Sequence, residues 1–351
     1  MPTITASALT QFTHALFVAG GSGAKEADVV SRSLIGANLR GHDSHGVMRV
    51  PFYIGKIKEG AVHPDSHLTV EHETPAVVIG DGGWGFGQVV SHELLERLIV
   101  KAQTIGIASG TLRRAAHIGR LGEYAEAAAA QGLTAIIIAN THGAGQRVAP
   151  VGGKRGRLGT NPLCIGMPGG KSGPFVLDFG TSATAEGKVR VKKIAGQPVP
   201  LGWVLDADGN PTTDSNAIYA EPPGSILPMG GDQAYKGFGL AYMIEMLCGG
   251  FSGGPCVHVN PPPPMGNCAM FLVLDPKLFA GADHLAREVA QLEKYVRAVP
   301  LREGVTSVTL PGDPERATLA KRSTDGIPLD DGNWNALVNL AKDLDIPVPS
   351  V

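Results

Sequence analysis

Groups that can move protons and bind anions are concentrated in one short stretch near the N-terminus. Ser44 and His45 are followed by Arg49 and Tyr53 at steps of about four residues. In a helix this spacing places the side chains on one face. An imidazole could then supply a proton while the Arg guanidinium binds a carboxylate bidentately and the hydroxyls orient the ligand. The stretch predicts a site that reduces a carbonyl beside a carboxylate, although a polar network at a helix start, with Asp43 or Ser44 as N-cap, is an equal alternative.

A second imidazole, His117, stands before an Ala-rich segment that we predict to be a helix over residues 122–131. The N-terminus of a helix disfavours a nearby cation, so this imidazole is expected to be neutral and able to accept a proton from an alcohol. A lone His at such a position is more often a capping or packing residue. Together with His45 and Arg49 it becomes a second candidate for proton transfer.

A metal centre is a weaker interpretation of the same residues. His42, Asp43 and His45 are near neighbours, but no H-E-x-x-H motif and no Cys-based partner set accompanies them. We therefore predict no metal. A metal-dependent hydrolase that uses His42, Asp43, His45 and His117 stays open as an alternative, as does a non-catalytic nucleotide-binding protein.

Phosphate-binding loops of the usual kinds are absent from the sequence. Neither the Walker pattern nor a G-x-G-x-x-G after a strand occurs. A predicted strand over residues 175–179 does run into Gly180 and Ser182, where backbone N–H groups at a helix start could hold a diphosphate, although a plain strand–turn–helix is the commoner meaning. Lys236 opens a predicted helix, where a cation is otherwise unfavourable. The basic run at residues 188–193 is either a solvated helix face or a partner for a nucleotide phosphate.

The whole composition is that of a globular protein that handles small molecules. Of 351 residues, 43% are hydrophobic and 18% charged, and 48 are Gly. Lys and Arg number 30 against 32 Asp and Glu, a net charge of −2, which argues against nucleic acid and membrane surfaces as partners. The four Cys form no C-x-x-C pair. We expect a reducing, cytoplasmic location.

Apolar periodicity predicts an α/β chain of mixed α+β character. An N-terminal layer of two helices fills the first forty residues, and strands and helices alternate from residue 76 onward. We expect strands near residues 76–80, 105–110, 133–140, 163–167, 175–179 and 270–274. We expect helices near residues 44–59, 88–103, 122–131, 183–195, 236–247, 283–299 and 334–344, and a short one after residue 313. Residues 203–214 and 249–264 are rich in turn formers and are expected to be surface loops or a mobile flap.

Taken together, these segments resemble the malate/L-lactate dehydrogenase family of the second type, whose members use NAD or NADP without a Rossmann fold. The resemblance spans residues 41 to 313 and depends on a set of short motifs. These are Asp43-Ser44-His45-Gly46 with Arg49 and Tyr53, His117-Ile118-Gly119-Arg120 with Tyr124, Gly159-Thr160-Asn161-Pro162, Leu177-Asp178-Phe179 with Ser182 and Gly187-Lys188, Gly202-Trp203 with Pro211-Thr212-Thr213-Asp214, Lys236-Gly237-Phe238-Gly239, and Leu310-Pro311-Gly312-Asp313.

The resemblance implies roles for individual residues. His45 and His117 would be the proton-transferring candidates with Ser44 beside them, and Arg49 and Tyr53 would bind the substrate. Cofactor contacts would fall on Thr141, Thr160, Pro174, Phe175, Val176, Leu177, Asp178, Phe179, Gly180, Ser182, Tyr235, Lys236, Gly312, Asp313 and Pro314. The cofactor would be NADPH or NADH, with NADP favoured because basic residues near Lys188 could meet a 2′-phosphate.

The same resemblance implies the architecture, the partners and the substrate class. The fold would combine a non-Rossmann nucleotide-binding sheet region, residues 76–280, with a helical domain built from residues 1–75 and 281–351. The protein would be a homodimer. Its substrate would be a small 2-oxoacid, of malate or lactate type, or a cyclic imino acid such as piperideine-2-carboxylate or pyrroline-2-carboxylate.

Overall fold

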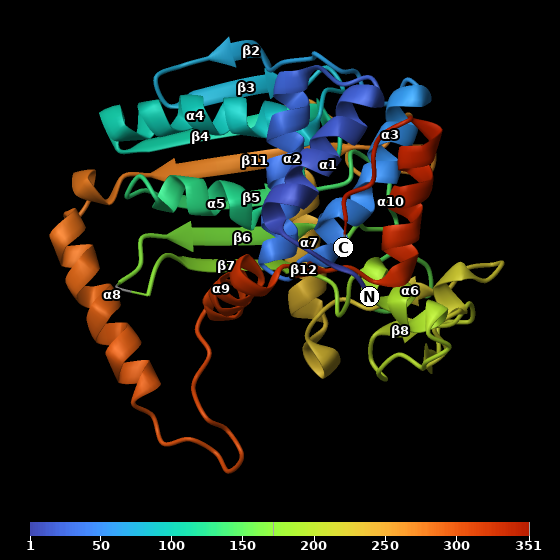
Figure 1. Cartoon of the computed structure of the whole chain (residues 1–351). Helices are drawn as coiled ribbons and strands as arrows, with labels where there is room; N and C mark the ends of the chain where they lie inside the picture. Colours follow the sequence, from blue (N-terminus) through green and yellow to red (C-terminus); the bar gives the residue numbers. More distant parts are fainter. Residues whose placement is uncertain (171, 351) are drawn as a thin grey trace.

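A seven-stranded mixed sheet forms the centre of the computed structural model, which describes residues 1–170 and 172–350 (Figure 1). The strand order is β2-β3-β4-β11-β5-β6-β7. The strands are β2 (Thr69–Glu73), β3 (Val77–Asp81), β4 (Ile107–Ala115), β5 (Thr134–Ala139), β6 (Pro162–Met167), β7 (Phe175–Gly180) and β11 (Asn267–Leu274). Within this sheet β3 and β4 pair in parallel, and the other described pairs are antiparallel. This pattern differs from the parallel sheet of a Rossmann domain, so the predicted non-Rossmann α/β class is confirmed.

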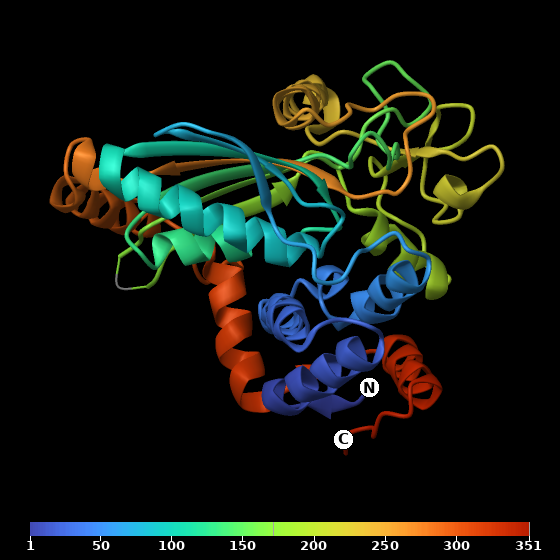
Figure 2. The ribbon, with the colours of Figure 1, turned by 90° about the horizontal axis from the view of Figure 1, so that it is seen from above.

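Helices cover both faces of the sheet. α4 (Gly87–Ile105) and α5 (Gly122–Ala129) lie on one face, and α7 (Tyr235–Ser252) lies on the other (Figure 2). The alternation along β11 explains how one strand serves two layers: Phe271 packs in the core under α4 and α5, whereas Cys268 packs in the smaller core under α7. Both cores fix the ends of β4, β5 and β11, from which the site is built.

Helices from the two ends of the chain form a second layer beside the sheet. α1 (Ala6–Ala19), α2 (Ala24–Leu39) and α3 (Val50–Lys58) share a core with α10 (Asp331–Asp343), and α9 (Asp313–Asp325) contacts α2. A short antiparallel pair, β1 (Thr3–Ile4) with β12 (Ile327–Pro328), joins the two ends of the chain.

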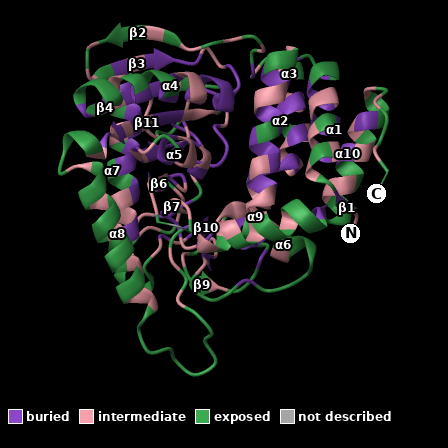
Figure 3. Cartoon of the chain, turned by 60° about the vertical axis from the view of Figure 1, so that its left-hand side comes forward, coloured by how far each residue is buried: buried purple, intermediate pink, exposed green. Residues whose placement is uncertain are grey.

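The helix α8 (Ala282–Arg297) stands apart from this layer. It extends from the far end of the sheet in Figure 1, and none of its described residues is buried (Figure 3). Of the stretch 281–351, therefore, α9 and α10 lie against the N-terminal helices and α8 does not. The division of the chain into domains stays a prediction.

A small lobe covers one end of the molecule. α6 (Glu186–Ile194) and the three-stranded sheet of β8 (Val204–Leu205), β9 (Pro211–Thr212) and β10 (Ser225–Ile226) enclose a third core. The stretch 203–214 thus holds two short strands where the sequence predicted only loops.

One expected helix end was wrong, and one strand was not expected. α7 continues to Ser252 instead of ending near residue 247. Gly249 does not end the helix. It lies where a Cβ would come within 2.7 Å of the Cys256 sulfur, so close packing requires a glycine there. β2 was not predicted, since its residues are nearly all exposed and lack apolar alternation.

The segment that carries the first motif is not one helix. It consists of two 3₁₀ turns, η1 (Asp43–His45) and η2 (Val47–Arg49), before α3 begins at Val50. Gly46 between them is extended, and a Cβ there would lie 2.2 Å from the Asn38 side chain, which accepts a hydrogen bond from the Val47 N–H at 2.8 Å. Asn38 therefore breaks the helix that the spacing predicted.

Among the described helices, none is both long enough and apolar enough to cross a bilayer.

Candidate active site

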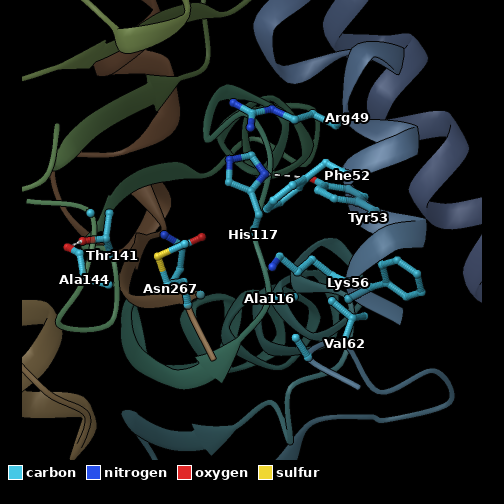
Figure 4. Close-up of a pocket in the computed structure, with 15 residues that line it drawn as sticks. Arg49, Phe52, Tyr53, Lys56, Val62, Ala116, His117, Thr141, Ala144 and Asn267 are labelled. Carbon is cyan, nitrogen blue, oxygen red and sulfur yellow. Dashed lines mark hydrogen bonds between the residues drawn. The ribbon is translucent and has the colours of Figure 1, made fainter. Parts of the chain in front are cut away.

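A cavity of about 210 Å³ opens where three sheet strands meet the N-terminal helices. β11 runs antiparallel between β4 and β5, so the carboxyl ends of β4 and β5 and the amino end of β11 reach the same edge of the sheet. α3 forms the facing wall (Figure 4). The lining residues are Arg49, Phe52, Tyr53, Lys56, Ala61, Val62, Phe86, Ala116, His117, Thr141, Ala144, Gly145, Met265, Gly266 and Asn267.

The imidazole of His117 is oriented by a hydrogen-bond chain from the opposite wall. Nε2 of Gln88 donates to the Tyr53 hydroxyl oxygen at 3.0 Å, and that hydroxyl lies 2.6 Å from Nδ1 of His117. The backbone N–H of Gly119 also donates to Nδ1, at 3.3 Å. Nδ1 therefore accepts, and the proton of the neutral ring lies on Nε2. This second nitrogen lies on the side of the ring away from Tyr53 in Figure 4.

His45 lies behind His117 and does not line the cavity. The two rings stack with centroids 5.5 Å apart and planes at 21°. Ser44 Oγ lies 3.1 Å from Nδ1 of His45, and Nε of Arg49 donates to the Ser44 carbonyl oxygen at 2.8 Å. The structure thus brings Ser44, His45, Arg49, Tyr53 and His117 together, although not through the single helix that we expected.

Burial keeps both imidazoles neutral. It is the main reason that the pKa of His45 falls to about 3, with the positive charge of Arg49 adding to the effect. The pKa of His117 is likewise held well below its ordinary value by burial, then by Arg49 and His45. Burial raises the pKa of Tyr53 to about 12, so its hydroxyl keeps its proton.

The residues named for a metal site do not converge. Nε2 of His42 pairs with Glu315 Oε1 at 3.2 Å, and Asp43 accepts from Arg322 at 2.7 Å and from Asn38 at 2.6 Å. His42 and Asp43 therefore contact α9 or α2, while His45 and His117 stack on each other. Within residues 1–170 and 172–350, no three His, Cys, Asp or Glu side chains gather as metal ligands do.

Of the predicted cofactor residues, one lines the cavity and three others lie close to one another. Thr141 lines it directly. Gly180 adjoins Thr160, since a Cβ at Gly180 would lie 3.6 Å from the Thr160 Cβ, and the Thr160 carbonyl accepts from the N–H of Thr181 at 2.8 Å. Ser182 is buried and donates to the Thr184 carbonyl at 2.8 Å.

The start of α7 is connected to residues 180–182 by Met229, which lies in the segment before the helix. The N–H of Met229 donates to the Thr181 carbonyl at 3.0 Å, and Met229 packs against Gly237. Tyr235 and Lys236 are exposed there. Within the described residues Lys236 has no carboxylate partner, so its charge is available to an anion.

The residues of the edge strand β7 that were predicted to contact the cofactor lie on two faces of the sheet. Leu177 is exposed and Phe175 and Phe179 are partly exposed, whereas Val176 packs into the sheet core. Asp178 accepts the Gly122 N–H at 2.7 Å and so caps α5. The side chains of Val176 and Asp178 are thus engaged by the protein itself.

The turn at residues 312–314 lies against the start of β7 but is also engaged by the protein. A Cβ at Gly312, whose φ is +88°, would lie 3.2 Å from the Pro174 carbonyl oxygen. Asp313 accepts from Arg297 at 2.9 and 3.0 Å and from Arg316 at 2.6 Å, and Pro314 follows inside α9. Gly312 and Asp313 therefore hold this turn in place.

Several residues of the site escaped the sequence analysis. No motif or spacing in the sequence singled out Gln88 or Lys56, because each is an ordinary polar residue of a predicted helix. Asn267 lines the cavity, and its Oδ1 accepts the N–H of Ile118, next to His117, at 3.1 Å. A single acidic residue inside an apolar helix, Glu245, could have been noticed.

Glu245 is buried under the two loops that carry the predicted cofactor threonines. Its Oε1 accepts from Asn140 Nδ2 at 2.8 Å and from the Val257 N–H at 2.9 Å, and its Oε2 accepts from Asn161 Nδ2 at 2.8 Å. Asn140 and Asn161 directly adjoin Thr141 and Thr160 in the chain. One carboxylate on α7 therefore fixes both loops.

The chain is similar to known proteins over most of its length. A sequence model of the family described as malate/L-lactate dehydrogenase matches residues 4–338. Hydroxycarboxylate dehydrogenase B of Escherichia coli (strain K12) is 38% identical over 346 residues, 97% of this chain and 94% of that protein. L-lactate dehydrogenase of Cupriavidus necator is 37% identical over 330 residues, 92% of this chain and 93% of that protein. The crystal structure of delta1-piperideine-2-carboxylate reductase from Pseudomonas syringae matches with a TM-score of 0.84 at 30% identity, covering 97% of this chain and 100% of the reductase.

Proposed function

The chain belongs to the malate/L-lactate dehydrogenase family and is an oxidoreductase, and from this premise we propose that it transfers a hydride between NAD(P)H and C2 of a small 2-oxoacid. The observation that carries the proposal is the convergence of Arg49, His117 and Thr141 on one cavity. Those side chains supply an anion partner, a proton-handling group and a residue predicted to contact the cofactor.

In the proposed reaction Arg49 binds the substrate carboxylate and His117 faces the C2 oxygen. An imidazole at this oxygen stabilises the negative charge that develops there on reduction. The substrate carboxylate offsets the Arg49 charge that helps to keep the ring neutral, so the ring can bind a second proton and become an imidazolium. It then gives one proton, the only one that reduction consumes, to the C2 oxygen and returns to the neutral form. The Tyr53 hydroxyl suits both states, since it can donate to neutral Nδ1 and accept from protonated Nδ1.

His117, and not His45, is the proposed proton-transferring residue. His117 lines the cavity, whereas His45 stacks on its far side. His45 and Ser44 would act by packing against His117 and by holding Arg49 through the Ser44 carbonyl.

The family implies a nicotinamide cofactor, which would supply the hydride. The residues that fit it are the small and hydroxyl-bearing Thr141, Thr160 and Gly180, the open face of β7, and Lys236 as a phosphate partner. Gly312 and Asp313 would help only by holding the start of β7.

NADP is the proposed form of the cofactor. Lys188 and Arg190 lie on α6, and the adjacent Gly187 lies beside Ser44, where a Cβ would come within 3.5 Å of the Ser44 Cβ. Within the described residues these two cations have no carboxylate partner, so a 2′-phosphate would find an unneutralised charge near the site. The homodimer expected from the family belongs to this proposal and is tested by light scattering of the purified chain.

A cyclic imino acid is the second candidate substrate, favoured by the likeness to the Pseudomonas reductase. Its nitrogen arrives protonated, so His117 would need only to orient it. The two candidates therefore differ in their need for the imidazole.

The test is nicotinamide oxidation, followed by absorbance, with pyruvate, oxaloacetate, 2-oxoglutarate, piperideine-2-carboxylate and pyrroline-2-carboxylate. The proposal expects turnover with at least one open 2-oxoacid and a loss of roughly 10- to 100-fold in kcat/KM in Arg49→Met. Arg32→Met, at an exposed arginine of α2, is the matched control and should leave kcat/KM unchanged. Turnover with cyclic imines alone would select the second candidate.

A further inference from the structure

The charge of the cavity is unusual for a site that binds a monoanion. Of the residues that line it, Arg49 and Lys56 are the charged ones, since burial and Arg49 keep His117 neutral. Among the described residues, no carboxylate belongs to the lining. A single substrate carboxylate would therefore engage only one of the two positive charges that face the cavity.

The two cations stand at opposite ends of the same wall. They are seven residues apart, and Arg49 directly precedes the first residue of α3 with helical backbone angles, so the two residues lie about two turns and roughly 10 Å apart along the axis, on the same face. Figure 4 shows the Arg49 guanidinium on one side of His117 and the Lys56 amine on the other. A substrate whose C2 oxygen meets His117 would therefore present one end to each cation.

Lys56 is free to change partners. Its amine lies 2.6 Å from Glu59 Oε2, but the Glu59 side chain is 60% exposed, and such surface pairs contribute little stability. Its amine also lies 5.6 Å from the Phe52 ring centroid, and both Phe52 and Lys56 line the cavity. An anion inside the cavity can replace Glu59 at a small cost.

We propose that Lys56 is a specificity-determining residue that binds a second anionic group, so that the substrate is a 2-oxoacid with a carboxylate at its far end. This inference rests on the proposed function, in which Arg49 binds the carboxylate next to C2. The remaining lining near Lys56, which includes Val62 and Ala61, is apolar and offers the distal group no other charged partner.

The experiment compares two four-carbon acids, oxaloacetate and 2-oxobutyrate, which differ in the distal carboxylate. The full-length wild-type protein is expected to prefer oxaloacetate in kcat/KM. Lys56→Met keeps the aliphatic stem and is expected to lower kcat/KM for oxaloacetate by roughly 10- to 100-fold, as for the loss of a charged hydrogen bond, while 2-oxobutyrate changes less than about twofold. Lys58→Met, an exposed lysine of the same helix outside the cavity, is the control and should leave the ratio unchanged.

The outcomes separate this inference from the proposed function. Turnover of both acids with the same ratio in wild type and Lys56→Met, or a wild-type preference for 2-oxobutyrate, would overturn the role of Lys56 alone. Absence of nicotinamide oxidation with any 2-oxoacid would instead overturn the proposed function, and this inference with it. Circular dichroism of each variant checks that the fold is intact.

Discussion

The Tyr53 hydroxyl oxygen lies 2.6 Å from Nδ1 of His117, and this contact joins the helical layer to the sheet. Tyr53 belongs to α3, whereas His117 follows β4. The Tyr53 side chain is buried, and Gln88 donates to its hydroxyl oxygen. The ring orientation at the site therefore depends on how the two layers pack together.

Replacing Tyr53 by Phe tests this contact. The variant keeps the aromatic packing but removes the hydroxyl, so Nδ1 of His117 loses its side-chain partner and keeps only the longer hydrogen bond from the Gly119 N–H. We expect kcat to fall about tenfold, the effect of one hydrogen bond, with an unchanged dissociation constant for the cofactor. Steady-state kinetics and nicotinamide fluorescence titration measure the two quantities. A wild-type kcat would show that Tyr53 does not orient the ring.

The roles of the two stacked imidazoles can be separated by matched substitutions. His117→Gln is expected to lower kcat by about 10²–10⁴-fold, as for the loss of a general acid–base group, while cofactor affinity stays the same. His45→Gln should have a smaller effect, because His45 does not line the cavity. The exposed His63 provides the control His63→Gln. An effect of His45→Gln that exceeds that of His117→Gln would reverse the assignment.

The pH dependence of 2-hydroxyacid oxidation follows from the lowered pKa of His117. Oxidation needs Nε2 as proton acceptor, so the ring must be neutral with its proton on Nδ1, where the Tyr53 hydroxyl can accept it. Burial, then Arg49, keeps the ring neutral at pH values where an ordinary His, with a pKa near 6.5, would be protonated. As pH falls through about 6.5, kcat/KM for oxidation should therefore stay constant and decline only at lower pH. Steady-state kinetics across this pH range would measure kcat/KM, and circular dichroism would detect unfolding. A decline of kcat/KM that began at pH 6.5 or above would show that His117 does not act as a proton acceptor with a lowered pKa.

Glu245→Gln tests whether the buried carboxylate positions the cofactor loops. Three N–H donors converge on its two oxygens, so a Gln amide must turn its own N–H groups toward at least one of them. We expect the free energy of unfolding to fall by about 1–3 kcal/mol and the cofactor dissociation constant to rise about tenfold. Chemical denaturation and fluorescence titration measure both. Glu288→Gln on exposed α8 is the control, and unchanged cofactor affinity in Glu245→Gln would leave Glu245 a purely structural role.

The parts of the fold that could be predicted are those in which a local pattern matches the final environment. The strand over 133–140 was expected because nearly every side chain in it is apolar, and β5 indeed lies inside the sheet. The helix across residues 44–59 was wrong because its disruption depends on Asn38, which acts on Gly46 and Val47 from another helix. No spacing rule within the segment contains that contact.

In the candidate site, too, the residues that could be predicted are those that a local motif marks. Arg49, Tyr53 and His117 were predicted because their chemistry and motif were visible, and the structure places them in one cavity. Nothing in the sequence marked Lys56, since its importance comes from the cavity that it shares with five other segments, which are residues 61–62, 86, 116–117, 141–145 and 265–267. The positions of Val176, Asp178 and Asp313 show the converse: a motif named them, but their side chains contact the protein's own core, helix α5 and arginines.

The proposed function requires that a hydride passes from C4 of the nicotinamide to C2 of a 2-oxoacid, and isotope transfer measures this step. The purified protein would be given reduced nicotinamide cofactor that carries deuterium at both C4 positions, together with oxaloacetate, and the product analysed by mass spectrometry and NMR. We expect a 2-hydroxyacid that carries one deuterium at C2. A product without deuterium, or no hydroxyacid from any 2-oxoacid of the panel, would contradict it.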